Sequence, residues 1–119
     1  MRLLSLTIAM FLPLAASAQE NAAVGTGAVL RGLEKISGDV IDITLGPGEQ
    51  ADFGPLTVQM AECRYPQGDP AADAFAFLSI RDEGQDEPIF SGWMIASSPA
   101  LNALDHPRYD VWVLRCKTE

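Results

Sequence analysis

The chain has 119 residues, and its eight Lys and Arg residues stand against sixteen Asp and Glu residues, which gives a formal net charge of −8 at pH 7. A surface of this sign repels phosphate backbones and anionic lipid head groups, which proteins bind with clusters of Lys and Arg. Nucleic-acid binding and direct binding to a membrane surface are therefore excluded as expected functions. The length allows one small domain.

The N-terminal segment MRLLSLTIAMFLPLAASAQE is typical of a secretory signal peptide. Arg2 precedes an apolar run over residues 3–14, and residues 16–18 form the small-residue cleavage site Ala-Ser-Ala. The run is shorter than the roughly 20 apolar residues that a membrane-spanning helix needs, which disfavours a transmembrane anchor. We therefore predict cleavage after Ala18 and export. Because Arg2 is then lost, residues 19–119 carry a net charge of −9.

Cys63 and Cys116 both lie in the mature part of the chain, which export would deliver to an oxidising compartment. A disulfide between them is therefore favoured over two free or metal-binding thiols. Such a bridge would close a loop of about 54 residues, for which the chain-entropy model gives about 4 kcal/mol of stabilisation. A domain of this size buries only a modest share of its unfolded surface, so this is a large contribution.

Residues 19–27 are small and polar without periodicity, which indicates a flexible leader, and residues 28–119 are predicted to form a single β domain. In that domain, short alternating segments are separated by Gly and Pro, a pattern typical of an all-β fold. A strand at 28–36 is the least certain, because its apolar residues fit a helix nearly as well. The predicted strands are 28–36, 39–45, 50–53, 56–64, 73–81, 89–95 and 110–117.

Alternation along the strands predicts which side chains face the core. In 56–64, Leu56, Val58 and Met60 share one face, and Cys63 falls on the other. Segment 73–81 is apolar on both faces, which predicts a central strand covered on both sides.

In 110–117, the pattern places Val111 and Val113 on one face and Trp112, Leu114 and Cys116 on the other. Because Trp112 shares a face with Cys116 of the predicted bridge, we expect it to fill the core or to cover the disulfide, in preference to joining an exposed binding surface.

Ser98 and Pro99 suit the cap and the first position of a short helical turn over residues 99–104. The predicted fold is thus a small antiparallel β-sandwich or barrel of about seven short strands with one short helical turn, stapled by a disulfide.

The block FSGWMIASSPALNALDHPRYDVWVLRC, residues 90–116, resembles the C-terminal signature of DUF2155, a family of small exported alphaproteobacterial proteins of unknown function. The family pattern runs close to F-S-G-W-M-x-A-S-S-P-A-L-x-A-L-x-H-P-x-Y-D-V-W-V-x-x-C. The segments ADFGPLTVQMAEC and AFAFLSI are similar to the family as well, whereas QGDPAADA departs from a glutamate-containing, proline-rich stretch. The resemblance implies a periplasmic location and a domain boundary, but no activity.

Candidate chemistry in this block is weak. A triad of Ser97 or Ser98 with His106 and Asp110 has suitable residue types but lacks the G-x-S-x-G elbow. Asp105 and Asp110 could be a glycosidase pair, but so small a domain offers little cleft. A metal site on His106 and these two acids lacks a second histidine or paired cysteines. We therefore predict no catalytic residue, no metal and no cofactor.

The aromatic residues are the better functional candidates, because amphipathic rings dominate binding surfaces. The favoured interpretation is a non-enzymatic periplasmic interaction protein, one form of which is an accessory component on the periplasmic face of an inner-membrane complex. An envelope polysaccharide-binding module and, less favoured, a small hydrolase are the alternatives. The candidate binding residues are Trp93, His106, Tyr109, Asp110 and Trp112.

Overall fold

The computed structural model describes residues 22–119. The predicted signal peptide and residues 19–21 lie outside this part. The regular structure in residues 22–119 is entirely β, and none of it is a helix that could span a bilayer. The strands are β1 (Ala22–Val24), β2 (Gly27–Glu34), β3 (Val40–Leu45), β4 (Gln50–Phe53), β5 (Leu56–Pro66), β6 (Phe75–Asp82), β7 (Phe90–Ile95) and β8 (Tyr109–Lys117).

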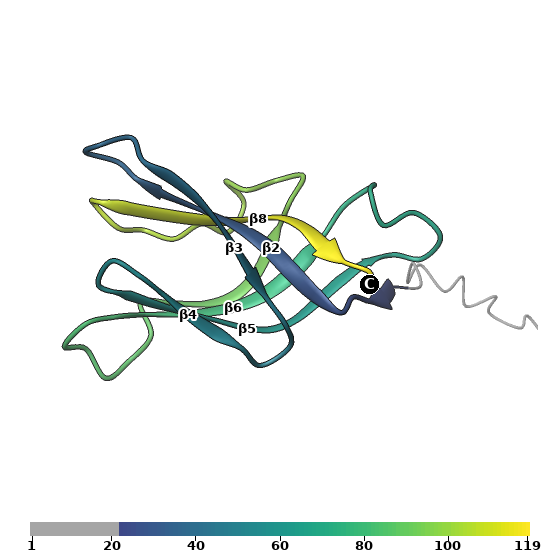
Figure 1. The fold of residues 1–119 in the computed structure, drawn as a ribbon, viewed down its shortest axis with the longest axis horizontal. Coiled ribbons are helices and arrows are strands. Elements are labelled where there is room, and N and C mark those ends of the chain that lie inside the picture. Colours follow the sequence, from purple (N-terminus) through teal and green to yellow (C-terminus); the bar gives the residue numbers. More distant parts are fainter. Residues whose placement is uncertain (1–21) are drawn as a thin grey trace, which may run out of the picture.

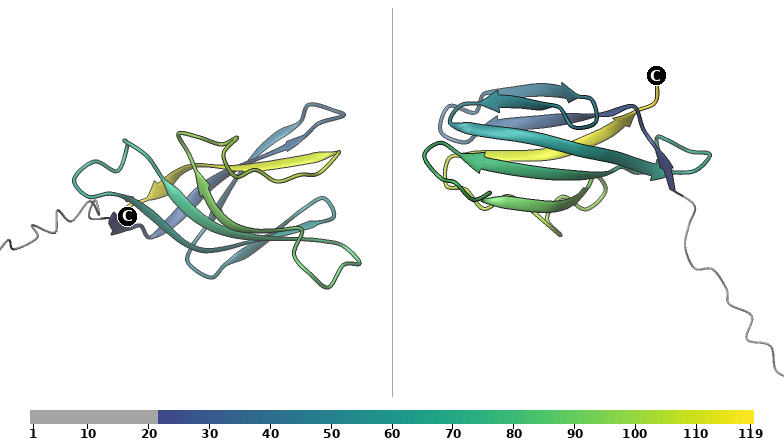
Figure 2. Two further views of the ribbon diagram at one scale, coloured as in Figure 1. Left: turned by 180° about the vertical axis from the view of Figure 1, so that it is seen from behind. Right: turned by 90° about the horizontal axis from the view of Figure 1, so that it is seen from below.

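The strands form two antiparallel sheets that face each other across one core (Figure 1). The larger sheet has the order β1-β5-β6-β7, with β4 also paired to β5, and the smaller has the order β3-β2-β8. Figures 1 and 2 show the sheets close together at the end that holds the C-terminus and splayed apart at the other. The core side chains include Leu30, Ile43, Leu56, Val58, Met60, Leu78, Ile80, Val111 and Val113.

All seven predicted strands are confirmed, including the uncertain one that became β2. Regular structure begins earlier than the predicted first strand at residue 28, because Ala22–Val24 pair with the last residues of β5 and β2 already begins at Gly27. β5 is long enough to pair with β4 over its first half and with β1 at its far end. Three residues are too few to show alternation, so the sequence could not reveal β1.

The predicted helical turn over residues 99–104 is also wrong. The segment contains turns instead, in which the Ser98 amide donates to the Ile95 carbonyl and the Leu101 amide donates to the Ser98 carbonyl. The chain then returns to the core, where Leu104 is buried. Burial of Leu104 thus takes precedence over the local preference for a cap and a helix start.

Two β-bulges determine where the cysteines point. In β5, Met60 pairs with Leu78 and Glu62 with Phe77, so Ala61 is an extra residue. In β8, Leu114 is extra in the same way, since Arg115 and Val113 pair with consecutive residues of β2. An extra residue reverses the alternation beyond it.

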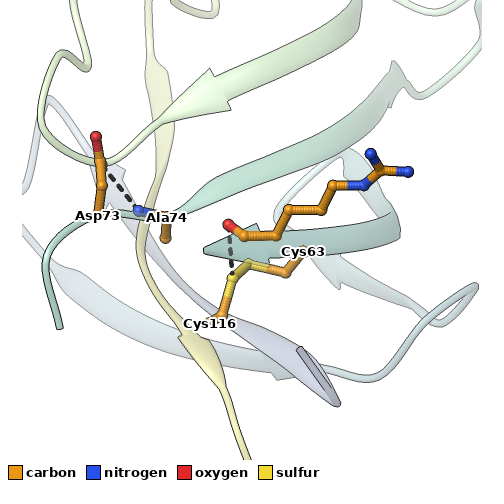
Figure 3. Close-up of a disulfide and its surroundings, with 5 residues drawn as sticks. Cys63, Asp73, Ala74 and Cys116 are labelled. Carbon is orange, nitrogen blue, oxygen red and sulfur yellow. Dashed lines mark hydrogen bonds between the residues drawn. A yellow bond between two sulfur atoms is a disulfide. The ribbon is translucent and has the colours of Figure 1, made fainter. Parts of the chain in front are cut away.

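Each bulge lies two residues before a cysteine, so Cys63 and Cys116 both turn into the core. The predicted disulfide between them is confirmed, with a Cα–Cα distance of 5.6 Å, and it joins the two sheets (Figure 3). The contact drawn there between Cys116 Sγ and the Arg64 carbonyl oxygen, 3.3 Å, is not a proton-donating hydrogen bond, because a disulfide sulfur carries no proton. The predicted faces of both cysteines were wrong, because simple alternation ignores bulges.

The bulge at Leu114 also explains why the prediction for Trp112 is wrong. Its neighbours Val111 and Val113 are buried, whereas Trp112 is half-buried on the outer face of the smaller sheet, opposite Arg31 of β2. Trp112 therefore does not cover the disulfide.

Candidate binding surface

The candidate residues do not form one surface. Trp93 lies on the outer face of the larger sheet and Trp112 on the outer face of the smaller one. His106 and Tyr109 come together at the splayed end, with ring centroids 5.5 Å apart. Asp110 is half-buried, and its carboxylate accepts a hydrogen bond from the adjacent Val111 amide.

His106 has both ring nitrogens engaged. Nδ1 accepts hydrogen bonds from the backbone amides of Arg108 and Tyr109, at 3.0 and 3.1 Å, so it carries no proton there. Nε2 then bears the proton of the neutral ring and donates it to Asp82 Oδ2 at 3.1 Å. The side chain is only 14% exposed. The His-Pro corner therefore joins the start of β8 to the end of β6 and has no nitrogen left for a substrate.

The triad does not assemble either. The Ser97 hydroxyl donates to Asp73 Oδ2 at 2.7 Å instead of to His106. Burial raises the pKa of Asp73, but hydrogen bonds from Ser97 and the Ala74 amide outweigh burial and hold this pKa below its usual value. This contact anchors the loop after β7 to the start of β6. In residues 22–119, no group of three His, Cys, Asp or Glu side chains is placed to hold a metal ion.

Tyr109 is a packing residue that fills the space between the splayed sheets. It is buried, and its ring meets that of Phe53 edge to face, with centroids 5.3 Å apart. A Cβ at Gly54 would lie 2.7 Å from the Tyr109 hydroxyl, so the close approach of this turn requires glycine.

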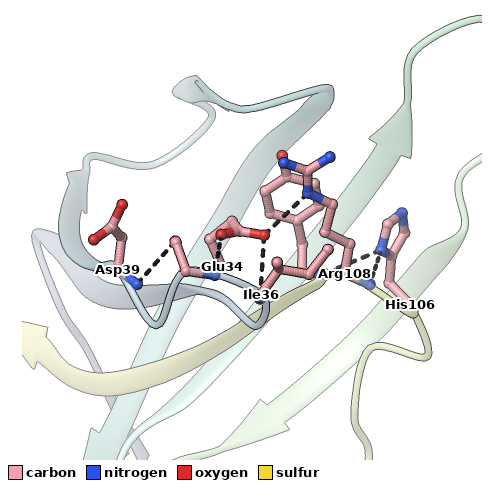
Figure 4. A network of polar contacts seen from close by, with 7 residues as sticks. Glu34, Ile36, Asp39, His106 and Arg108 are labelled. Atoms are coloured by element: carbon pink, nitrogen blue, oxygen red, sulfur yellow. Dashed lines mark hydrogen bonds and ion pairs between the residues drawn. The ribbon is translucent and has the colours of Figure 1, made fainter.

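A polar network around Glu34 fixes the β2–β3 turn beside this corner (Figure 4). The Glu34 carboxylate accepts hydrogen bonds from the amides of Ile36 and Ser37, at 3.2 and 2.7 Å, and from Arg108 Nε at 3.0 Å. Hydrogen bonds from Ser37, followed by those from Arg108 and Ile36, lower the pKa of Glu34 from 4.5 to about 2.

This lowered pKa predicts how stability depends on pH. Because the folded-state pKa is below the unfolded value, the contribution of the Glu34 carboxylate is complete above about pH 4.5 and is lost as pH falls toward 2. Glu34→Gln should therefore unfold more readily than wild type at pH 7 and become nearly equal to it at pH 2. Urea unfolding of both proteins between these values would measure the difference. A difference that stays constant down to pH 2 would contradict the role of the ionised carboxylate.

The outer face of the larger sheet carries an apolar surface, which we call the aromatic face and define as Phe75, Phe77, Trp93 and Ile95. These residues adjoin across β6 and β7, where Phe77 pairs with Trp93 and Phe75 with Ile95. Phe77 and Trp93 pack edge to face at 5.4 Å, and Trp93 is 38% exposed. None of the four belongs to the core in residues 22–119, and no other strand of that part covers them.

An arginine completes this surface. The Arg64 guanidinium lies 5.7 Å from the centroid of the Trp93 ring, and its Nη2 contacts Glu62 Oε1 at 3.0 Å. The ion pair and the cation–π contact together hold Arg64 across one face of the indole.

The sequence indicated only part of this surface. Segment 73–81 was correctly recognised as apolar on both faces, and β6 is central in its sheet, but the prediction that both faces are covered was wrong. Ala76, Leu78 and Ile80 fill the core, whereas Phe75 and Phe77 remain half-buried outside it. Arg64, Phe75 and Phe77 were missed as binding candidates, although the apolar residues on both faces of segment 73–81 were a usable signal.

These features define a class of protein: a small all-β domain, stapled by a disulfide, with an exposed aromatic face. Residues 28–116 match the family described as "Uncharacterized protein conserved in bacteria (DUF2155)", and the chain belongs to this family. The curated protein "Uncharacterized protein RP359" of Rickettsia prowazekii (strain Madrid E) is 29% identical over 87 residues. That match covers 71% of this chain and 56% of RP359, so the chain spans just over half the length of this relative. No solved structure matches the chain.

Proposed function

We propose that this protein is an exported, non-enzymatic interaction protein of the periplasm that binds another protein through the aromatic face. One form of this role is an accessory component on the periplasmic face of an inner-membrane complex. Export is supported by the N-terminal sequence pattern and by the disulfide, since disulfides persist in oxidising compartments. In this proposal the two facing sheets form a small β-sandwich, whose outer faces are available to partners.

The proposal rests on an aromatic surface whose residues do not belong to the hydrophobic core of residues 22–119. Residues 22–119 form a core between the two sheets, yet Phe75, Phe77 and Trp93 of the same part face outward from the larger sheet. Contiguous apolar patches on small proteins mark binding sites, and tryptophan and arginine are enriched among the residues that dominate binding energy. Trp93 beside Arg64 has this composition.

A protein partner is favoured over a polysaccharide because of the way Trp93 is held. Sugar binding would use a freely accessible ring face, but Arg64 lies over one face of the indole and Phe77 packs against the ring at 77°. An arginine on an aromatic ring is suited to a carboxylate or a carbonyl of a protein partner. A sugar ring on that side would have to displace Arg64.

The test compares the two tryptophans, which lie on opposite outer faces. The full chain is expressed with its own N-terminal segment and a photo-crosslinking residue in place of Ser91, which is exposed next to Trp93 on the same face. The mass of the purified protein also reports whether cleavage occurs after Ala18. We expect one protein adduct, and none from the same residue placed at Thr44 on the other sheet.

Once that partner is isolated, Trp93→Ala should weaken its binding about 30-fold, the loss of about 2 kcal/mol that is typical of a central interface residue. Trp112→Ala is the matched control and should change binding less than about twofold. Wild-type affinity in Trp93→Ala, or a large loss in Trp112→Ala alone, would refute the proposed surface.

A further inference from the structure

The turn between β2 and β3 exposes several aliphatic side chains in residues 34–41, which we call the hairpin tip. Ile36 is 77% exposed, Val40 51% and Ile41 45%. The hairpin tip belongs to the smaller sheet at the splayed end, opposite the end that holds the C-terminus (Figure 1). It is therefore separate from the aromatic face, which lies on the other sheet.

The hairpin tip is held rigidly although it is exposed. The Glu34 carboxylate accepts the amides of Ile36 and Ser37, and the Ser37 hydroxyl accepts the amide of Asp39 at 3.2 Å. The Glu34 amide donates to the Asp39 carbonyl, and the Gly38 amide donates to the Glu34 carbonyl. Gly38 supplies the positive φ of 78° that this turn needs. These bonds fix the backbone that presents Ile36, although Ile36 itself packs against little.

The charges around the hairpin tip are also ordered. The Lys35 ammonium donates to the His106 carbonyl at 2.8 Å, and Arg108 is paired with Glu34 while its guanidinium lies over Tyr109. Both cations are thus turned back onto the protein. The exposed Asp39 carboxylate has no hydrogen bond or ion pair within residues 22–119. The hairpin tip therefore presents isoleucine and valine with an acidic group at its rim.

From this arrangement we infer that the hairpin tip is a preorganised anchor that inserts Ile36 into an apolar pocket with a basic rim on a partner protein. A segment already fixed in its bound conformation loses little entropy on binding, which is the advantage of building a rigid network around an exposed side chain. The basic rim would pair with Asp39. This second surface goes beyond the proposed function, because it would let the protein hold two partner surfaces at once.

The negative charge of the protein disfavours two alternatives, binding of the hairpin tip to anionic lipid and binding to a second copy of this chain. Anionic lipid head groups would be repelled by Asp39 and by the net charge of −9 on residues 19–119. A second copy of this chain would bring two such charges together. A basic pocket on another protein is attracted by both.

The test places a photo-crosslinking residue at Val40 in the full, exported chain and uses purified unlabelled variants as competitors. We expect a protein adduct that wild-type competitor suppresses and that Ile36→Ser suppresses at least about tenfold less well. Leu101→Ser is the matched control, because Leu101 is also an exposed aliphatic residue, at 75%, and this variant should compete like wild type. Glu34→Gln should also compete less well, since it loosens the hairpin tip without removing Ile36.

Several outcomes would overturn the inference. These are equal competition by Ile36→Ser and wild type, equal competition by a folded Glu34→Gln, or an adduct with the mass of two copies of this chain. Binding to vesicles of phosphatidylethanolamine and phosphatidylglycerol that Ile36→Ser abolishes would assign the hairpin tip to lipid instead. The adducts formed at Val40 and at Ser91 are measured separately, so failure of the aromatic face and failure of the hairpin tip can be distinguished.

Discussion

Replacing Cys63 and Cys116 together by alanine is expected to lower the free energy of unfolding by about 4 kcal/mol. The bridge joins β5 of the larger sheet to β8 of the smaller one and spans a sequence separation of 53 residues. Without it the unfolded chain gains the entropy of a long open loop. A small domain has a total stability of about 5–15 kcal/mol, so the loss is severe.

Urea unfolding of the double variant and of wild type, with equal slopes, would measure this loss. Wild-type protein unfolded and refolded under reducing conditions should match the double variant, since it lacks the same constraint. A loss below about 1 kcal/mol would show that packing between the sheets, and not the bridge, holds them together.

Gly32→Ala is expected to cost about 3 kcal/mol, at the upper end for an extra methyl group in a packed core. Gly32 lies on the inner face of β2, and a Cβ there would lie 1.9 Å from Phe53 Cε2. The Phe53 ring is buried and packed edge to face on Tyr109, so it cannot move without disturbing the splayed end.

A double-mutant cycle would show that Phe53 is the cause. Phe53→Leu removes the ring atoms that collide with the new methyl group, so Gly32→Ala should cost much less in that background than in wild type. Gly46→Ala is the matched control, because its nearest neighbour is the end of the exposed, flexible Glu49 side chain, and we expect a change of less than about 1 kcal/mol. Additive costs for Gly32→Ala and Phe53→Leu would contradict the collision.

The strands were predictable because alternation is a local property of the sequence. Ile43 and Leu45 in β3, and Val111 and Val113 in β8, were assigned to one face and are buried together. The alternation of side chains is interrupted at Ala61 and Leu114, and the sequence pattern could not show this. A bulge is recognised only from the register of the neighbouring strand. The cysteine faces and Trp112 were mispredicted for this reason.

The candidate site was predictable only where its signal was local. Trp93 was selected for its chemistry and does face solvent. The hydrogen-bond partner of His106 is Asp82, which lies 24 residues away in the sequence. No local pattern around either residue predicts this contact. Likewise Arg64 reaches Trp93 only because β5 and β7 flank β6. Contacts of this kind depend on sheet order, which the strand pattern left open.

The most direct test of the aromatic face uses each tryptophan as its own reporter. Trp112→Phe leaves Trp93 as the single indole, and Trp93→Phe leaves Trp112. When the partner crosslinked at Ser91 is titrated in, the emission of Trp93 should shift to the blue as its exposed ring is buried, and that of Trp112 should stay constant. A shift at Trp112 with none at Trp93 would place the interaction on the other sheet and contradict the proposed function.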